Sequence, residues 1–239
     1  MRLLQNFLLT TVTLLAVAAS APAQSALTIP EADFDFGRTS QHAVVSHRFW
    51  IHSTGAKPLE ITHVVPGCGC TKAPLKDSVV APGDSTYLDL YFSTKSYRGF
   101  VKKRPYLETS QDEIKHYMMI SAELLPLPDT VQPVHLSPSR LDVSQFRPKV
   151  RRKASFWIVN TDTVDYRVKY VDHADYVFDL NLPEKVAAGD SAKGSVSVLD
   201  EYIETDFEHS LTFELDDADR TRYTLPVQRM YRVKESAGK

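Results

Sequence analysis

The 239-residue chain contains little cysteine, little glycine and almost no excess of charge. Two cysteines cannot build a disulfide-rich scaffold, and nine glycines argue against the glycine-rich loops that hold nucleotide phosphates. A formal net charge of -2 gives no basic footprint for nucleic acid. Hydrophobic residues make up 43% of the chain, which is enough for a packed core and excludes a disordered protein.

The chain also lacks the sequence signatures of common enzyme classes. No Gly-x-Ser-x-Gly elbow, His-Glu-x-x-His motif, P-loop or dinucleotide-binding fingerprint occurs. A nucleophilic site built from Cys68 and His63 would need a third, orienting group, and no signature supports one. We therefore predict that the protein is not an enzyme.

No apolar run reaches the roughly 20 residues that a bilayer span needs. The N-terminal run from Leu8 to Ala19 is shorter and is interrupted by threonines. It follows Arg2 and precedes Ala21-Pro22-Ala23, a pattern typical of a secretory signal peptide. We predict a signal peptide over residues 1–23, a mature chain without a transmembrane or lipoprotein anchor, and a periplasmic or secreted location.

Short alternating segments separated by turn residues fill the rest of the chain. Apolar and polar residues alternate from Val45 to Ile51, and the segments Tyr87 to Phe92 and Tyr117 to Leu124 also predict strands. No convincing helical period appears after residue 27. Many short strands with frequent turns predict an all-β protein of the sandwich or barrel type.

An internal repeat divides the chain into two halves. Phe49-Trp50-Ile51 recurs as Phe156-Trp157-Ile158, and the segment Val80 to Ser85 recurs as Val186 to Ser191 at nearly the same offset. Each half is about 100 residues long, the size of an immunoglobulin-like sandwich. We predict two tandem immunoglobulin-like β-sandwich domains.

The domain boundaries follow from the repeat and from the proline content between its copies. We place the first domain over residues 28–124 and the second over residues 136–233. Residues 125–135 read as a proline-rich linker, because proline removes backbone donors and ends sheets.

The most unusual segment is Cys68-Gly69-Cys70, which has no counterpart in the second half. Three interpretations remain open for the two cysteines: packed thiols, a strained local disulfide, or thiolate ligands for copper or zinc. A metal site needs more ligands, and His47 and His63 are expected on the apolar sides of two strands that fold back at Gly55. The competing interpretation is that both histidines are satisfied by backbone carbonyls in the core and that no cofactor binds.

Several motifs of the first half resemble a known bacterial family. The residues that carry the resemblance occur in family order: Phe34-Asp35-Phe36-Gly37, His47-x-Phe49, Gly55 to Leu59, Cys68-Gly69-Cys70-Thr71, Ala81-Pro82-Gly83 and Gly99. They resemble the family catalogued as domain of unknown function 1573, which is similar in fold to ASH, major-sperm-protein and PapD-type domains. Gly67 and His52 stand where that family usually has Ser and Asn. The resemblance covers roughly residues 30–124 and implies an immunoglobulin-like fold without a known activity.

Two features are candidates for partner binding. Strand alternation turns Trp50 and Trp157 away from the predicted cores. Either the two side chains face a partner, or they are covered by a neighbouring loop or by the other domain. The basic run Arg147 to Lys153 is either an edge strand protected by charge or a docking site for an acidic partner.

These observations predict an exported, non-enzymatic interaction or scaffold protein of the cell envelope, with an envelope protein as its partner and no nucleic acid. The alternative is a metal-binding or redox-active periplasmic protein centred on Cys68 and Cys70. A third interpretation is a module that binds glycan or peptidoglycan, which Tyr and Trp clustered on one exposed face would favour.

Overall fold

The computed structural model describes residues 27–125 and 133–233. The predicted signal peptide and most of the predicted linker lie outside these residues. Within them the protein is all-β, as expected, and the only helical element is the short 3-10 helix η1. None of the described helical segments is long and apolar enough to cross a membrane.

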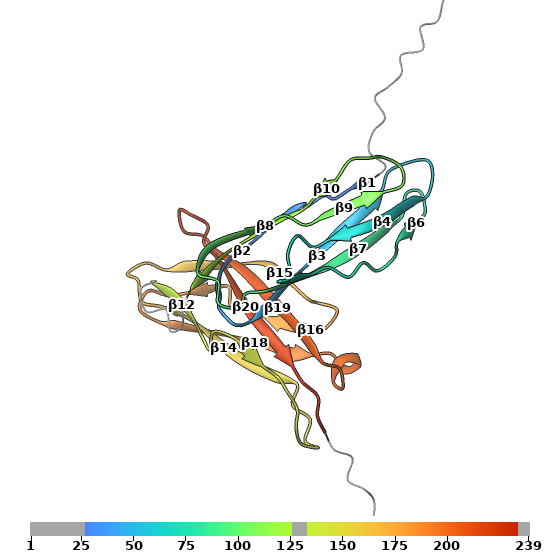
Figure 1. The fold of residues 1–239 in the computed structure, drawn as a ribbon. Helices are drawn as coiled ribbons and strands as arrows, with labels where there is room; N and C mark the ends of the chain where they lie inside the picture. Colours follow the sequence, from blue (N-terminus) through green and yellow to red (C-terminus); the bar gives the residue numbers. More distant parts are fainter. Residues whose placement is uncertain (1–26, 126–132, 234–239) are drawn as a thin grey trace, which may run out of the picture.

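Residues 27–125 form two facing layers of strands (Figure 1). One layer has the order β1-β3-β7-β5, and the other consists of β10-β9-β4-β6 together with β2, β11 and β8. The strands are β1 (Leu27–Thr28), β2 (Asp33–Ser40), β3 (Val44–Ser53), β4 (Leu59–Val65), β5 (Thr71–Lys72), β6 (Val79–Val80), β7 (Ser85–Ser93), β8 (Gly99–Lys103), β9 (Tyr106–Thr109), β10 (His116–Tyr117) and β11 (Met119–Leu125).

Residues 133–233 repeat this arrangement. The sheet β12-β14-β18-β16 faces the strands β17, β15, β19 and β20. The elements are β12 (Val134–Ser137), β13 (Leu141–Asp142), β14 (Lys153–Asn160), β15 (Tyr166–His173), β16 (Phe178–Asn181), β17 (Lys185–Val186), β18 (Ser191–Val198), η1 (Asp200–Tyr202), β19 (Phe207–Leu215) and β20 (Arg222–Arg229).

Each half has its own hydrophobic core because its strands bury every second side chain. Phe49 and Leu88 belong to the cluster of the first half, and Phe156 and Val196 belong to that of the second. The repeated segments also occupy equivalent positions: Phe49 lies in the strand pair β3/β7 and Phe156 in the pair β14/β18. The repeat seen in the sequence therefore corresponds to a repeated strand pair around a buried phenylalanine.

The two halves are joined along a seam that the repeat alone did not predict. Strand β2 runs parallel to β20 and pairs with it at Arg38 and Tyr223, so one sheet, β17-β15-β19-β20-β2-β11-β8, contains strands of both halves. Figure 1 shows β2, β15, β19 and β20 together where the halves meet. Across the seam, Ser210 Oγ accepts a hydrogen bond from Ser46 N at 2.9 Å and donates one to Ser46 O at 3.1 Å.

One glycine is required by this seam. Gly37 in β2 has a φ of +61°, and a Cβ at this position would overlap the backbone carbonyl of Arg222 in β20. Two constraints therefore act together, since L side chains disfavour this φ and the neighbouring strand leaves no space. Nearby, Thr224 Oγ1 donates a hydrogen bond of 2.5 Å to Phe36 O, which ties the same two strands together.

Candidate functional site: a cleft between the halves

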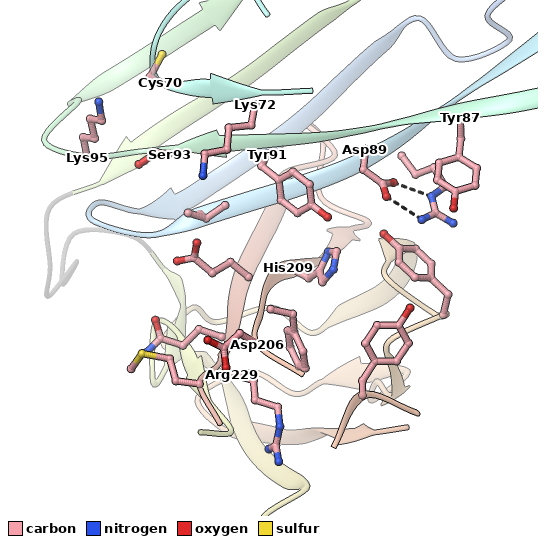
Figure 2. A pocket seen from close by; sticks show the side chains of 18 of the residues that line it. Cys70, Lys72, Tyr87, Asp89, Tyr91, Ser93, Lys95, Asp206, His209 and Arg229 are labelled. Atoms are coloured by element: carbon pink, nitrogen blue, oxygen red, sulfur yellow. Dashed lines mark hydrogen bonds and ion pairs between the residues drawn. The ribbon is translucent and has the colours of Figure 1, made fainter. Parts of the chain in front are cut away.

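A cleft of about 1090 Å³ lies between the two halves. Its first wall is the outer face of β3, β5 and β7. Its second wall comes from the β15–β16 loop, η1, the start of β19 and the end of β20 (Figure 2). Because no single half contains both walls, the cleft exists only where the halves are joined.

Strand alternation explains the first wall. In β7, Leu88 and Leu90 point into the core, so Tyr87, Asp89 and Tyr91 point outward into the cleft. The environment of the outer face of β3 changes along the strand. Strand β19 covers the first part of this face, the middle is half-buried in the cleft, and the last part is open to solvent. A single sheet face thus passes from the seam through the cleft to the surface.

Arg48 connects the two walls. Its guanidinium donates two hydrogen bonds to the Asp89 carboxylate, at 2.7 and 2.9 Å, which Figure 2 marks with dashed lines. The same group lies between two tyrosine rings, with its Cζ 3.6 Å from the centroid of Tyr87 and 3.6 Å from that of Tyr176. Tyr87 belongs to the first half and Tyr176 to the second, so this stack fixes the width of the cleft. Burial is the largest single effect and lowers the pKa of Arg48, but the hydrogen bond to Asp89 and the charge interactions with Asp89, Tyr176 and Tyr87 together exceed it, so the pKa is raised.

His209 lies at the bottom of the cleft, next to the seam. Its Nδ1 is 3.1 Å from Ser46 Oγ, and its ring is packed 5.4 Å from Tyr91 and 5.6 Å from Tyr176, centroid to centroid. Burial lowers the pKa of His209 to about 4, so the ring is neutral at pH 7. Burial also raises the pKa of Tyr91 to about 12 and raises that of Tyr176, so both phenols keep their protons and can donate hydrogen bonds.

The charged groups of the cleft are unevenly paired. Asp206 forms an ion pair of 2.8 Å with Arg232. In contrast, no ion pair among the described residues includes Lys72 or Lys95, which Figure 2 shows on the first-half side near Ser93. This wall therefore carries two ammonium groups outside any ion pair, and on the opposite wall Glu208 is likewise in no ion pair among the described residues.

Cys68 and Cys70 form a disulfide at the edge of the cleft, with Cα atoms 5.3 Å apart. Of the three interpretations of the pair, the structure contains the local disulfide. Cys70 is 6% exposed, and Thr71 Oγ1 lies 3.2 Å from the sulfur of Cys68. Metal binding at these two positions would require reduction of the bond, because the thiolate is the ligand.

The two histidines of the candidate metal set lie in different surroundings. His47 is buried as expected, but its partner is a carboxylate of the other half: Nδ1 is 2.8 Å from Asp172 Oδ2. The side chain of His63 is 71% exposed and its Nδ1 lies 3.6 Å from Glu108. The expectation that His63 faces the apolar side is wrong, because the register between β4 and β9 shifts between Ile61 and His63.

In the part of the chain that the structure describes, no group of three or more His, Cys, Asp or Glu side chains is placed to hold a metal ion. His47, His63, Cys68 and Cys70 are therefore not assembled into one cluster. Copper or zinc binding by these residues stays a prediction.

The outward orientation expected for both tryptophans is confirmed. Trp50 is 47% exposed and Trp157 is 40% exposed. Trp50 packs edge-to-face against Tyr87, 5.4 Å between centroids, and so extends the aromatic wall of the cleft onto the surface. Trp157 lies on β14 in a different sheet, with Lys193 Nζ 5.6 Å above its ring. A role for either tryptophan in binding stays a prediction.

The residues that build the cleft were largely missed in the sequence. Tyr87, Asp89 and Tyr91 alternate with buried residues in a predicted strand, so their outward orientation was available as a signal. Nothing in the sequence places Arg48 between rings that are far apart in the chain, or His209 beneath them.

With this geometry established, the family can be stated. Residues 27–124 match the family model described as Protein of unknown function (DUF1573). The match covers the first half of the chain, and residues 27–124 are called the DUF1573 half below. The resemblance read from its motifs is thereby confirmed, and the DUF1573 half supplies the whole first wall of the cleft. No curated protein matches the chain.

The solved structures that match this chain share little sequence with it, and their TM-scores are low. A protein of unknown function from Porphyromonas gingivalis W83 is 14% identical, with 85% of this chain and 99% of that chain covered and a TM-score of 0.36. The ASH/PapD-like domain 7 of human CEP192 is 11% identical over 49% of this chain and 97% of that chain, with a TM-score of 0.37. The D00-D0 domain of intimin is 10% identical, covers 84% of this chain and 96% of that chain, and has a TM-score of 0.29.

Proposed function

We propose that this protein is an exported, non-enzymatic interaction module of the cell envelope, and that it binds a segment of an envelope protein in the cleft between its halves. The observation that carries the proposal is the Arg48 stack, which holds Tyr87 and Tyr176 of the two halves at a fixed separation. Concave, preorganised surfaces lined by aromatic and arginine side chains are typical of binding sites.

Export and domain organisation are part of the same proposal. The signal pattern over residues 1–23 supports export. The repeat, together with one core in each half, supports two tandem immunoglobulin-like sandwiches over residues 28–124 and 136–233. Both ends of the predicted linker at 125–135 belong to strands, since β11 ends at Leu125 and β12 begins at Val134. The absence of catalytic sequence signatures supports a non-enzymatic role.

The chemistry of the cleft indicates the kind of segment that it accepts. Lys72 and Lys95 present positive charge, while Tyr91 and Tyr176 present phenol groups that stay protonated. We expect an acidic segment with side chains that accept hydrogen bonds, held next to Trp50.

Tyrosine clustering also favours a second candidate, the binding of a glycan or peptidoglycan fragment. Four tyrosines line the cleft: Tyr87, Tyr91, Tyr176 and Tyr202. Sugars usually bind by stacking on a free aromatic face, and Arg48 already occupies one face of Tyr87 and one of Tyr176. The peptide segment is therefore the preferred ligand.

Site-specific photocrosslinking in the native envelope tests the proposal. A benzophenone amino acid replaces Tyr91 in the cleft, and a control replaces Tyr117, which is 40% exposed on β10 outside the cleft. We expect a discrete protein adduct from position 91 and none from position 117. The double variant Lys72→Glu/Lys95→Glu should remove the adduct, whereas equal labelling at both positions would overturn the proposal.

Mass spectrometry of the same envelope preparation tests export and the non-enzymatic role separately. A mature chain that begins near Gln24 supports export, and an intact Met1 contradicts it. A partner whose mass is unchanged after incubation with excess protein supports a non-enzymatic role, and a cleaved or modified partner contradicts it. Saturable quenching of Trp50 fluorescence by peptidoglycan fragments, with no protein adduct, would instead favour the glycan.

A further inference from the structure

The loop between β13 and β14 carries a concentrated positive charge. It contains Arg147, Lys149, Arg151 and Arg152, and Lys153 follows as the first residue of β14. None of residues 143–153 is acidic, although the chain as a whole has a net charge of -2. Within the described residues, only Arg152 of these five is ion-paired, with Asp200 at 2.6 Å. Since ion pairing satisfies only one of these charges, the loop is a local cationic site on a slightly acidic protein.

The same loop exposes two large apolar side chains. Phe146 is 56% exposed and Val150 is 51% exposed, although both residue types are usually buried. They line a shallow hollow of about 620 Å³ together with the cations of the loop. In Figure 1 the loop protrudes at the lower end of the view, beyond the start of β14 and away from the DUF1573 half. The apolar groups therefore stand at a projecting end of the molecule.

The loop is held in place from below by a buried arginine. Arg229 is 1% exposed and donates hydrogen bonds to the carbonyl oxygens of Val143 and Arg151 and to Gln145 Oε1. Gln145 Oε1 also accepts a hydrogen bond of 3.2 Å from Arg151 N. A fixed backbone means that little conformational entropy is lost when the loop binds.

We propose that the loop of residues 145–153 is a docking site for an anionic lipid surface, with Phe146 and Val150 inserted among the headgroups and the cations against the phosphates. A pair of projecting apolar side chains surrounded by Lys and Arg matches the interfacial region of an anionic membrane in both polarity and charge. Binding of an acidic protein would account for the cations of the loop but not for the exposed phenylalanine and valine. Binding of an anionic lipid surface accounts for both, so we prefer it. The edge-strand explanation of the basic run also fails to account for them, since β14 begins only at Lys153.

Vesicle sedimentation tests this docking site with the mature chain from Gln24. Vesicles of phosphatidylcholine with about 30% phosphatidylglycerol serve as the probe at about 0.15 M salt, and pure phosphatidylcholine vesicles serve as the control. We expect binding to the anionic vesicles only. Arg147→Gln with Lys149→Gln should weaken binding about 30-fold, because each cation near an anionic surface contributes about 1 kcal/mol.

The apolar half of the site is tested separately. Phe146→Ser with Val150→Ser should weaken binding at least about tenfold through the loss of buried apolar area. The matched control Phe100→Ser, at a position that is 69% exposed in the other half, should bind as the wild type does. Since all three side chains are exposed, the urea midpoints of these variants should be unchanged. In a Phe146→Trp variant, brominated lipid should also quench the added fluorescence.

Two results would overturn the lipid proposal. One is failure of the wild-type protein to sediment with anionic vesicles. The other is unchanged binding by the Phe146→Ser/Val150→Ser variant, which would show that the loop attracts anions only and would point to an acidic protein as its partner.

Discussion

Acidification is expected to weaken the seam between the halves through His209. This side chain is 5% exposed, and burial lowers its pKa from 6.5 to about 4. Asp89 and Asp172 favour its protonated form while Arg48 opposes it, and burial exceeds all three effects. Native His209 is therefore neutral, and adding a proton would place a charge in a buried site beside Tyr91 and Tyr176, where Asp89 and Asp172 compensate it only in part.

The sign of the effect follows from where the proton binds. Between pH 6.5 and about 4, His209 binds a proton in the unfolded chain but not in the folded chain. The free energy of unfolding therefore falls as the pH falls. The shift corresponds to a loss of about 2 kcal/mol between about pH 7 and pH 5, and about 3 kcal/mol once the pH is below 4. Above pH 6.5 the histidine contributes no pH dependence.

Urea unfolding followed by circular dichroism at pH 7 and pH 5 measures this loss. His209→Asn keeps a polar group near Ser46 Oγ but does not titrate, so most of the pH dependence should disappear. His52→Asn, at an exposed position of β3, should retain it. Burial also lowers the pKa of His173, which leaves a smaller residual slope of the same sign. Full pH dependence in His209→Asn, or greater stability at pH 5 than at pH 7, would refute the reasoning.

Three further predictions concern the seam, the disulfide and the cleft. In urea unfolding, Gly37→Ala should destabilise the protein by more than about 3 kcal/mol. The control Gly83→Ala should cost only about 1 kcal/mol, because Gly83 also has a positive φ but has open space around it. Replacing Cys68 and Cys70 together by Ser should leave the β-sheet circular dichroism spectrum intact and cost about 1.5 kcal/mol, because so short a loop restricts the unfolded chain little; complete unfolding at room temperature would contradict this. Arg48→Lys should lower the free energy of unfolding by about 1–2 kcal/mol and make the seam more accessible to limited proteolysis. Lysine can neither bind a carboxylate through two hydrogen bonds nor lie flat between two rings. An unchanged proteolysis pattern would show that the Arg48 stack does not hold the two halves together.

Local patterns in the sequence determined the class of the fold and part of the surface. The period of two in the segments around Phe49 and Phe156 predicted strands, buried phenylalanines and outward tryptophans, because alternation is a property of each strand by itself. The motifs around the cysteine pair were sufficient to identify the DUF1573 family in the first half. His63 shows the limit of this reasoning, since one register shift in β4 moved it to the opposite side.

Only the tertiary structure decided how the two halves meet. The bond between Cys68 and Cys70 was one of three open interpretations, and the turn that brings their Cα atoms to 5.3 Å settles it in favour of the disulfide. The pairing of His47 with Asp172, and the position of Arg48 between rings of both halves, depend on contacts between residues far apart in the sequence. Such contacts arise from the packing of two sheets against each other, which the periodicity of either sheet alone does not specify.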